Sequence, residues 1–274
     1  MKKKELKALV SLLEDSSLRS DIEFKIMELG TDTIPYLEKE WEKTFDPDLQ
    51  GYLEDIIHKL QLELLKERLV DWKQSESDDL LKGMWIVATI QYPDLSLEKL
   101  QQDFEQLYYE VWLEHKPDAH YYDKVKFINS VLFSKLKFRA NTRNFHAPAN
   151  SMINIVMETK KGNPISLSVL YLLIAQKLDM PIFGVNLPNM FILTYKDKDE
   201  QFYINAFNRG LIFSREDIDS YITQINLAPR PIFYEPCSHT DIVIRSMRNL
   251  SIAFEKLDDH AKADEVKELL ALVE

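Results

Sequence analysis

The feature that most constrains this fold is a run of apolar residues from Ser166 to Leu178. Apolar side chains recur there at helical spacing and fill most of the remaining helix surface: Leu167, Val169, Leu170, Tyr171, Leu172, Leu173 and Ile174. A helix that is apolar on nearly all sides is buried on nearly all sides. Three strand-like runs follow at 182–187, 190–196 and 201–207. The stretch predicts a mostly helical α+β protein, in which a buried central helix packs on a small antiparallel sheet.

The size and charge of the chain restrict its function class. Its 274 residues allow a sizeable core and one to three domains. The net charge of −11 argues against a nucleic-acid partner, because such binding depends largely on clustered Lys and Arg. The longest apolar run is too short to span a bilayer, the N-terminus shows no secretion-signal pattern, and the single cysteine fits a reducing compartment. We therefore expect a cytoplasmic protein without a membrane partner.

Two segments carry a family resemblance. They read KKGNPISLSVLYLLIAQKLDMPIFGVNLPNMFILTY at 160–195 and YINAFNRGLIFSRED at 203–217. These segments resemble the SirB-type transglutaminase-like family, a branch of the papain-like and transglutaminase-like superfamily. The resemblance extends upstream, more weakly, to about Leu80. It implies a transglutaminase-like core, in which the N-terminal end of the buried helix lies beside residues of the sheet.

Helical segments flank this core on both sides. The pattern L-G-x-x-x-I-P-x-L at 29–37 resembles one HEAT-type repeat, and an irregular helical bundle is the alternative. The pattern N-L-x-x-x-F at 249–254 resembles a tetratricopeptide-type helical pair. We predict a HEAT-like helical region at 1–74, the core at 75–232, and a tetratricopeptide-like helical hairpin at 233–274.

The resemblance allows each position of a catalytic triad to be inspected. Active members of the wider superfamily carry a cysteine at the start of the buried helix, a strand histidine, and an Asp or Asn on the next strand. The cysteine position falls on Pro164 or, with a two-residue slip, on Ser166. The histidine position is Met190 and the acid position is Asn205. Because methionine cannot transfer a proton at a useful pKa, no catalytic residue is expected at these positions.

Catalytic groups could instead lie elsewhere in the chain. Cys237 stands two residues before His239, although a packing cysteine is the simpler interpretation of that pair. Ser166 with His146 is the other candidate, but a serine at a helix start is usually a cap. No histidine pairs with a second His or Cys at ligand spacing apart from Cys237-x-His239, so neither a metal nor a cofactor is expected.

The sequence therefore favours a non-catalytic, regulatory protein that binds a protein or peptide partner. The cleft that would hold an acyl substrate in active relatives could still accept an extended peptide, with Ser166, Asn189, Met190 and Asn205 as its lining. One alternative is a cysteine or serine acyl-transferase or hydrolase with relocated catalytic groups. A purely structural role in a larger regulatory complex is the other.

Overall fold

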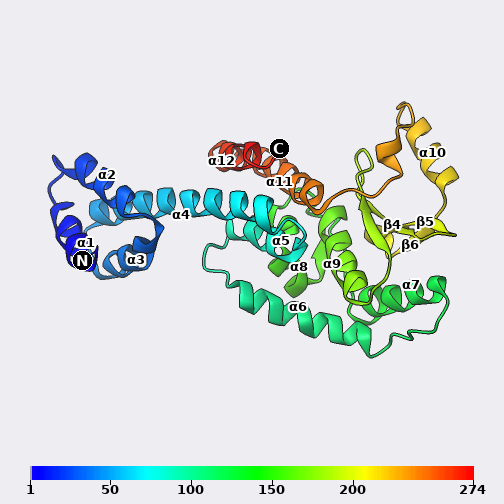
Figure 1. Cartoon of the computed structure of the whole chain (residues 1–274). Coiled ribbons are helices and arrows are strands. Elements are labelled where there is room, and N and C mark those ends of the chain that lie inside the picture. The colour runs from blue at the N-terminus through cyan, green and yellow to red at the C-terminus, as the bar shows by residue number, and fades with distance from the viewer. Residues whose placement is uncertain (1) are drawn as a thin grey trace. The chain divides into compact units, whose positions relative to one another are not determined.

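A computed structural model describes residues 2–274 of the chain, which divides into two compact units at 1–68 and 69–274. Helices dominate both units, and the second also holds a four-stranded antiparallel sheet (Figure 1). The predicted α+β class is confirmed. No helix of the described chain is both long and apolar enough to cross a lipid bilayer.

The first unit is helical throughout. Its elements are α1 (Lys2–Leu12), α2 (Arg19–Leu29), the 3₁₀ turn η1 (Thr31–Thr33), α3 (Ile34–Lys43) and the start of α4 (Pro47–Ser75). Leu13, Ile26, Leu37, Leu53 and Ile56 are fully buried in its apolar core. Pro35 lies in the first turn of α3, where a missing backbone donor costs no hydrogen bond. Amphipathic spacing thus produces a small helical core of its own.

The second unit begins within α4 and continues through a series of helices. In chain order these are α5 (Leu80–Thr89), α6 (Leu97–Trp112), α7 (Tyr121–Asn129), α8 (Ile153–Thr159), α9 (Pro164–Lys177), α10 (Arg215–Gln224), α11 (His239–Glu255) and α12 (His260–Ala271). Shorter turns join them at η2 (Ser130–Lys135), η3 (Pro148–Ser151), η4 (Ala206–Asn208) and η5 (Pro231–Phe233). Helix α7 ends at Asn129 and leads directly into the π-helical turn η2.

The sheet follows directly after α9. Its strands β3 (Ile182–Val185), β4 (Ile192–Lys196), β5 (Gln201–Asn205) and β6 (Leu211–Phe213) are antiparallel neighbours in chain order. Gly184 pairs with Leu193, Thr194 with Tyr203, and Tyr203 with Phe213. The three predicted strand runs correspond to β3, β4 and β5. A two-residue parallel pair, β1 (Arg139–Ala140) with β2 (Lys161–Gly162), was not predicted, because strands this short show no alternation in sequence.

Helix α9 lies at the centre of this unit. Every residue from Ile165 to Ala175 is buried, as the apolar run predicts. The helix contacts β3 and β4 on one side and α5, α6, α8 and α11 on others, as the ribbon in Figure 1 shows. Its start is fixed by a capping box between Asn163 and Ser166. The N-terminal end of α9 is therefore fixed by hydrogen bonds within its own first turn.

Candidate functional site

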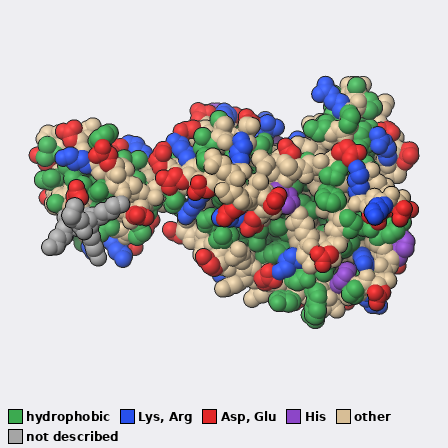
Figure 2. Space-filling view, in the orientation of Figure 1, with side chains coloured by type: hydrophobic (Ala, Val, Ile, Leu, Met, Phe, Trp, Pro, Cys, Tyr) green, Lys and Arg blue, Asp and Glu red, His purple; other side chains and the backbone are tan. Residues whose placement is uncertain are grey.

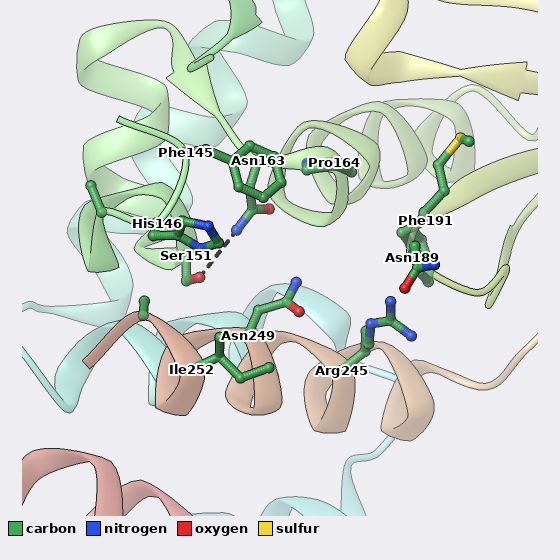
Figure 3. Close-up of a pocket in the computed structure, with 13 residues that line it drawn as sticks. Phe145, His146, Ser151, Asn163, Pro164, Asn189, Phe191, Arg245, Asn249 and Ile252 are labelled. Atoms are coloured by element: carbon green, nitrogen blue, oxygen red, sulfur yellow. Dashed lines mark hydrogen bonds between the residues drawn. The ribbon is translucent and has the colours of Figure 1, made fainter. Parts of the chain in front are cut away.

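A pocket of about 340 Å³ lies at the N-terminal end of α9. Its walls come from four parts of the chain: the segment before α8, the start of α9, the connection between β3 and β4, and α11 (Figure 3). The residues that line it are Phe145, His146, Ala147, Ser151, Asn163, Pro164, Asn189, Met190, Phe191, Arg245, Asn249, Ile252 and Ala253. A pocket of this volume can hold a small ligand or a side chain of a bound partner.

The start of α9 provides one wall of the pocket. Asn163 Oδ1 accepts a hydrogen bond from the backbone N–H of Ser166 at 2.8 Å, and Ser166 Oγ accepts from the backbone N–H of Asn163 at 3.0 Å. Asn163 Nδ2 also donates to Ser151 Oγ at 3.1 Å, the bond drawn in Figure 3. Pro164 follows at the first helical position and faces the pocket. Ser166 is completely buried, and its hydroxyl serves as a cap rather than as pocket lining.

Met190 and Asn205 lie together on the sheet side of the pocket. Met190 lines the pocket and packs against the apolar cluster formed by Val185, Leu187, Ile192, Tyr203, Ile218, Ile222 and Tyr234. Asn205 Nδ2 lies 3.5 Å from Met190 Sδ, and Asn205 Oδ1 accepts from the Asn208 backbone at 3.1 Å. Asn205 thus stands behind Met190 rather than among the lining residues.

The three positions that the resemblance assigns to a triad are therefore close in space. Pro164 and Met190 line one pocket, and Asn205 contacts Met190. The chemical groups that they present are a pyrrolidine ring, a thioether and a carboxamide. None of these is a nucleophile or a proton acceptor near neutral pH. Asn189, the fourth predicted cleft residue, is exposed on the β3–β4 connection and lines the pocket beside Met190.

A buried asparagine positions the loop that carries Phe145 and His146. Asn150 is 3% exposed, and its Nδ2 donates to the carbonyls of Asn144 at 2.7 Å and Phe145 at 2.9 Å. Its Oδ1 accepts from Asn141 Nδ2 at 2.8 Å. Three hydrogen bonds to one buried side chain thus fix the shape of the loop that carries Phe145 and His146. Asparagine is usually exposed, so the sequence gives no sign that Asn150 is buried.

Helix α11 contributes two polar side chains that sequence inspection missed. Arg245 and Asn249 are four residues apart, so they lie on one helix face, and both extend into the pocket (Figure 3). Arg245 Nη1 donates to Asn186 Oδ1 at 3.0 Å. Burial, with a smaller effect of the Arg248 charge, lowers the pKa of Arg245, yet a guanidinium stays protonated in proteins. Ser246 and Arg248 stand between them, so no pattern in the sequence distinguishes this pair from its polar neighbours.

The candidate groups for relocated chemistry do not form a dyad. His239 Nδ1 donates to the carbonyl of Asp78 at 2.8 Å, and its Nε2 accepts from Gln176 Nε2 at 2.8 Å, so both ring nitrogens have partners. Burial, followed by the nearby Asp241 charge, raises the pKa of the Cys237 thiol to about 12. His146 lines the pocket, whereas within the described chain the Ser166 hydroxyl hydrogen-bonds only in the Asn163 cap. Among the described residues, no cluster of three His, Cys, Asp or Glu side chains could hold a metal ion.

Comparisons with known proteins place these features in a family. The model described as the transglutaminase-like superfamily matches residues 98–248, which include α9, the sheet and Arg245. A UPF0162 protein of Xylella fastidiosa is 27% identical over 198 residues, 67% of this chain and 67% of that protein. F-box only protein 21 of Mus musculus is 32% identical over 105 residues, which are 35% of this chain and 17% of that protein. No solved structure matches the chain significantly. Because the matched region exceeds half of the sequence, this chain belongs to the transglutaminase-like superfamily.

Proposed function

We propose that this protein is a non-catalytic, regulatory member of the superfamily, of the SirB type, that binds a protein or peptide segment in the pocket beside α9. One observation supports this most directly. Pro164, Met190 and Asn205 cluster at the place expected for a triad, but they present no nucleophile and no base. A pocket at this place that lacks such groups is suited to binding.

The lining of the pocket matches a peptide better than a purely apolar ligand. Phe145, Phe191 and Ile252 offer apolar surface, while His146, Asn189 and Asn249 offer hydrogen-bonding groups. Peptides present both kinds of group at short spacing along an extended chain. The wall formed by α9 is also preorganised by its cap, which lowers the entropic cost of ligand binding.

We also propose that the partner is a protein rather than a nucleic acid or a membrane. On the face that Figure 2 shows, acidic and basic side chains are interspersed, which favours a protein partner over a nucleic acid or a membrane surface. The helices at 1–74 and 233–274 are proposed to be HEAT-like and tetratricopeptide-like segments, which flank the core at 75–232 in the sequence. A cytoplasmic location is part of the proposal.

Peptide binding is tested with the full chain and an immobilised library of random short peptides. A subset of the immobilised peptides is expected to bind and retain the wild-type chain. Asn249→Phe, which places a ring in the pocket from the face of α11, is expected to lose most of that retention. Lys256→Phe adds the same ring to an exposed position at the end of α11 and is expected to behave as wild type. Failure of the wild-type chain to retain any peptide would contradict the proposal.

The non-catalytic part is tested separately with a panel of activated esters, peptide amides and glutamine–amine pairs. No hydrolysis or transfer above the buffer rate is expected. An activity that disappears in Cys237→Ala or Ser166→Ala would support relocated catalytic groups instead. Purified protein that has passed through two independent chromatographic steps guards against a contaminating hydrolase.

A further inference from the structure

The pocket beside α9 differs in charge from the rest of the chain. The whole sequence carries a net charge of −11, with 45 Asp and Glu residues against 34 Lys and Arg. Among the described residues that line the pocket there is no Asp or Glu, and Arg245 supplies a positive charge. A cationic, acid-free pocket in an acidic protein attracts an anionic group, because the potential inside a partly closed site follows its nearest charges.

Arg245 retains capacity to bind a ligand. Within the described chain its guanidinium donates one hydrogen bond, to Asn186 Oδ1 at 3.0 Å, and forms no ion pair with a carboxylate. A guanidinium has five N–H donors, so most of its donors remain for other partners. Arg248, three residues later, shows the contrast: its Nε and Nη2 both bind Glu274 Oε1, at 3.1 and 2.7 Å. Of these two arginines on α11, the one in the pocket lacks an anionic partner.

The surrounding groups also favour an anion. Asn249 stands one helical turn after Arg245 and extends from α11 into the pocket, and Asn189 lies near the guanidinium on the opposite wall (Figure 3). Their side-chain amides can donate hydrogen bonds. The opposite end of the pocket is formed by Asn163 and Pro164 at the positive end of the α9 dipole. The side-chain donors and the positive end of the α9 dipole therefore all border the same pocket.

We infer that the pocket receives a carboxylate of the bound peptide, held by Arg245 and Asn249, while Phe145, Phe191 and Ile252 contact the apolar residues beside it. This inference rests on the proposed peptide-binding function. A carboxylate is favoured over a phosphate because one guanidinium matches the two carboxylate oxygens, whereas phosphopeptides are recognised by clusters of arginines. The carboxylate can come from an Asp or Glu side chain or from the C-terminus of the peptide.

The test uses the full chain and random short peptides in two forms, with a free C-terminus and with an amidated C-terminus. Phosphoserine is included among the building blocks. Enrichment of Asp or Glu in the amidated form assigns a side-chain carboxylate. Enrichment of the free-acid form without an acidic side-chain preference assigns the C-terminal carboxylate. Fluorescence anisotropy then compares the best peptide with its counterpart carrying an amide in place of the carboxylate.

We expect the amide counterpart to bind about 10- to 100-fold more weakly, the usual effect of losing a charged hydrogen bond. Arg245→Gln is expected to remove this difference, Arg245→Lys to reduce it, and Arg248→Gln to leave it intact. Equal unfolding midpoints for the variants show that the fold is retained. Peptide binding without carboxylate preference, a preference for phosphoserine, or a preference that survives in Arg245→Gln overturns the carboxylate assignment and leaves the proposed function standing. Failure of every peptide to bind overturns both.

Discussion

The side-chain amide of Asn205 lies 3.5 Å from the sulfur of Met190, on the sheet side of the pocket that Pro164 also lines. Three side chains that are 26 and 15 residues apart in sequence are thus grouped at the end of one helix. Their arrangement follows from the antiparallel pairing of β4 with β5, and from the packing of β4 and of the turn η4 after β5 on α9. The three positions that the family resemblance assigns to a triad are therefore close in space, and they carry a proline, a methionine and an asparagine.

This grouping predicts that a reactive thiol can be introduced. A cysteine at position 164 would stand at the N-terminus of α9, where the helix dipole favours a thiolate. Adding Met190→His to Pro164→Cys should speed alkylation of the thiol near pH 7 compared with Pro164→Cys alone, because a nearby imidazolium stabilises the thiolate. Iodoacetamide labelling followed by mass spectrometry measures both rates. Equal rates in the single and double variants would show that positions 164 and 190 do not face each other.

Cys237 is predicted to be an unreactive thiol. Burial, and then the charge of Asp241, raises the pKa of its thiol from 9.0 to about 12, so the folded state favours the neutral form. The resulting contribution to stability is complete below about pH 9 and is lost as the pH rises from 9 towards 12. We expect slow alkylation of the native chain near neutral pH and ordinary alkylation in urea. The alkaline loss of stability should be smaller in Cys237→Ala, and fast native labelling at neutral pH would contradict the assignment.

Ser166 is predicted to act on stability and not on ligand binding. Ser166→Ala leaves the buried backbone N–H of Asn163 without its acceptor, which costs about 1–3 kcal/mol of unfolding free energy. Ser168→Ala is a matched control on α9: this serine is also fully buried, but its hydroxyl has no partner within the described chain, so its removal should be nearly neutral. Urea unfolding measures the change in unfolding free energy for both variants. Loss of peptide binding in Ser166→Ala with unchanged stability would point to a site role instead.

Gly210 is predicted to tolerate no side chain. It has φ +73° in the turn between β5 and β6, and a Cβ there would collide with the side chain of Asn129, whose Nδ2 donates to the Gly210 carbonyl at 2.8 Å. Gly210→Ala should lower the free energy of unfolding by more than the roughly 1–2 kcal/mol that a left-handed backbone alone costs an alanine. Gly51→Ala, in α4 with open space around it, should instead stabilise by about 1 kcal/mol through helix propensity. Thermal unfolding of both variants, compared with wild type, tests the contrast.

Local pattern predicted the main elements well. The apolar run at 166–178 corresponds to α9 (Pro164–Lys177), and the runs at 182–187, 190–196 and 201–207 correspond to β3, β4 and β5. The patterns that predict these elements involve residues close in sequence, so they can be recognised in a single sequence. The strand β6 and the β1–β2 pair depend on partners elsewhere in the chain and were not predicted.

The fold class, the buried central helix, and the lack of Cys and His at the positions that the family resemblance assigns to a triad can all be recognised in the amino-acid sequence. The lining of the pocket depends on tertiary contacts. The folded chain brings Arg245 and Asn249 from α11 against Asn163 and Pro164, more than eighty residues earlier, and it encloses Ser166 within the cap. Helical periodicity is set by local backbone geometry, whereas a binding site is set by contacts between distant segments, and no local pattern records which segments will meet.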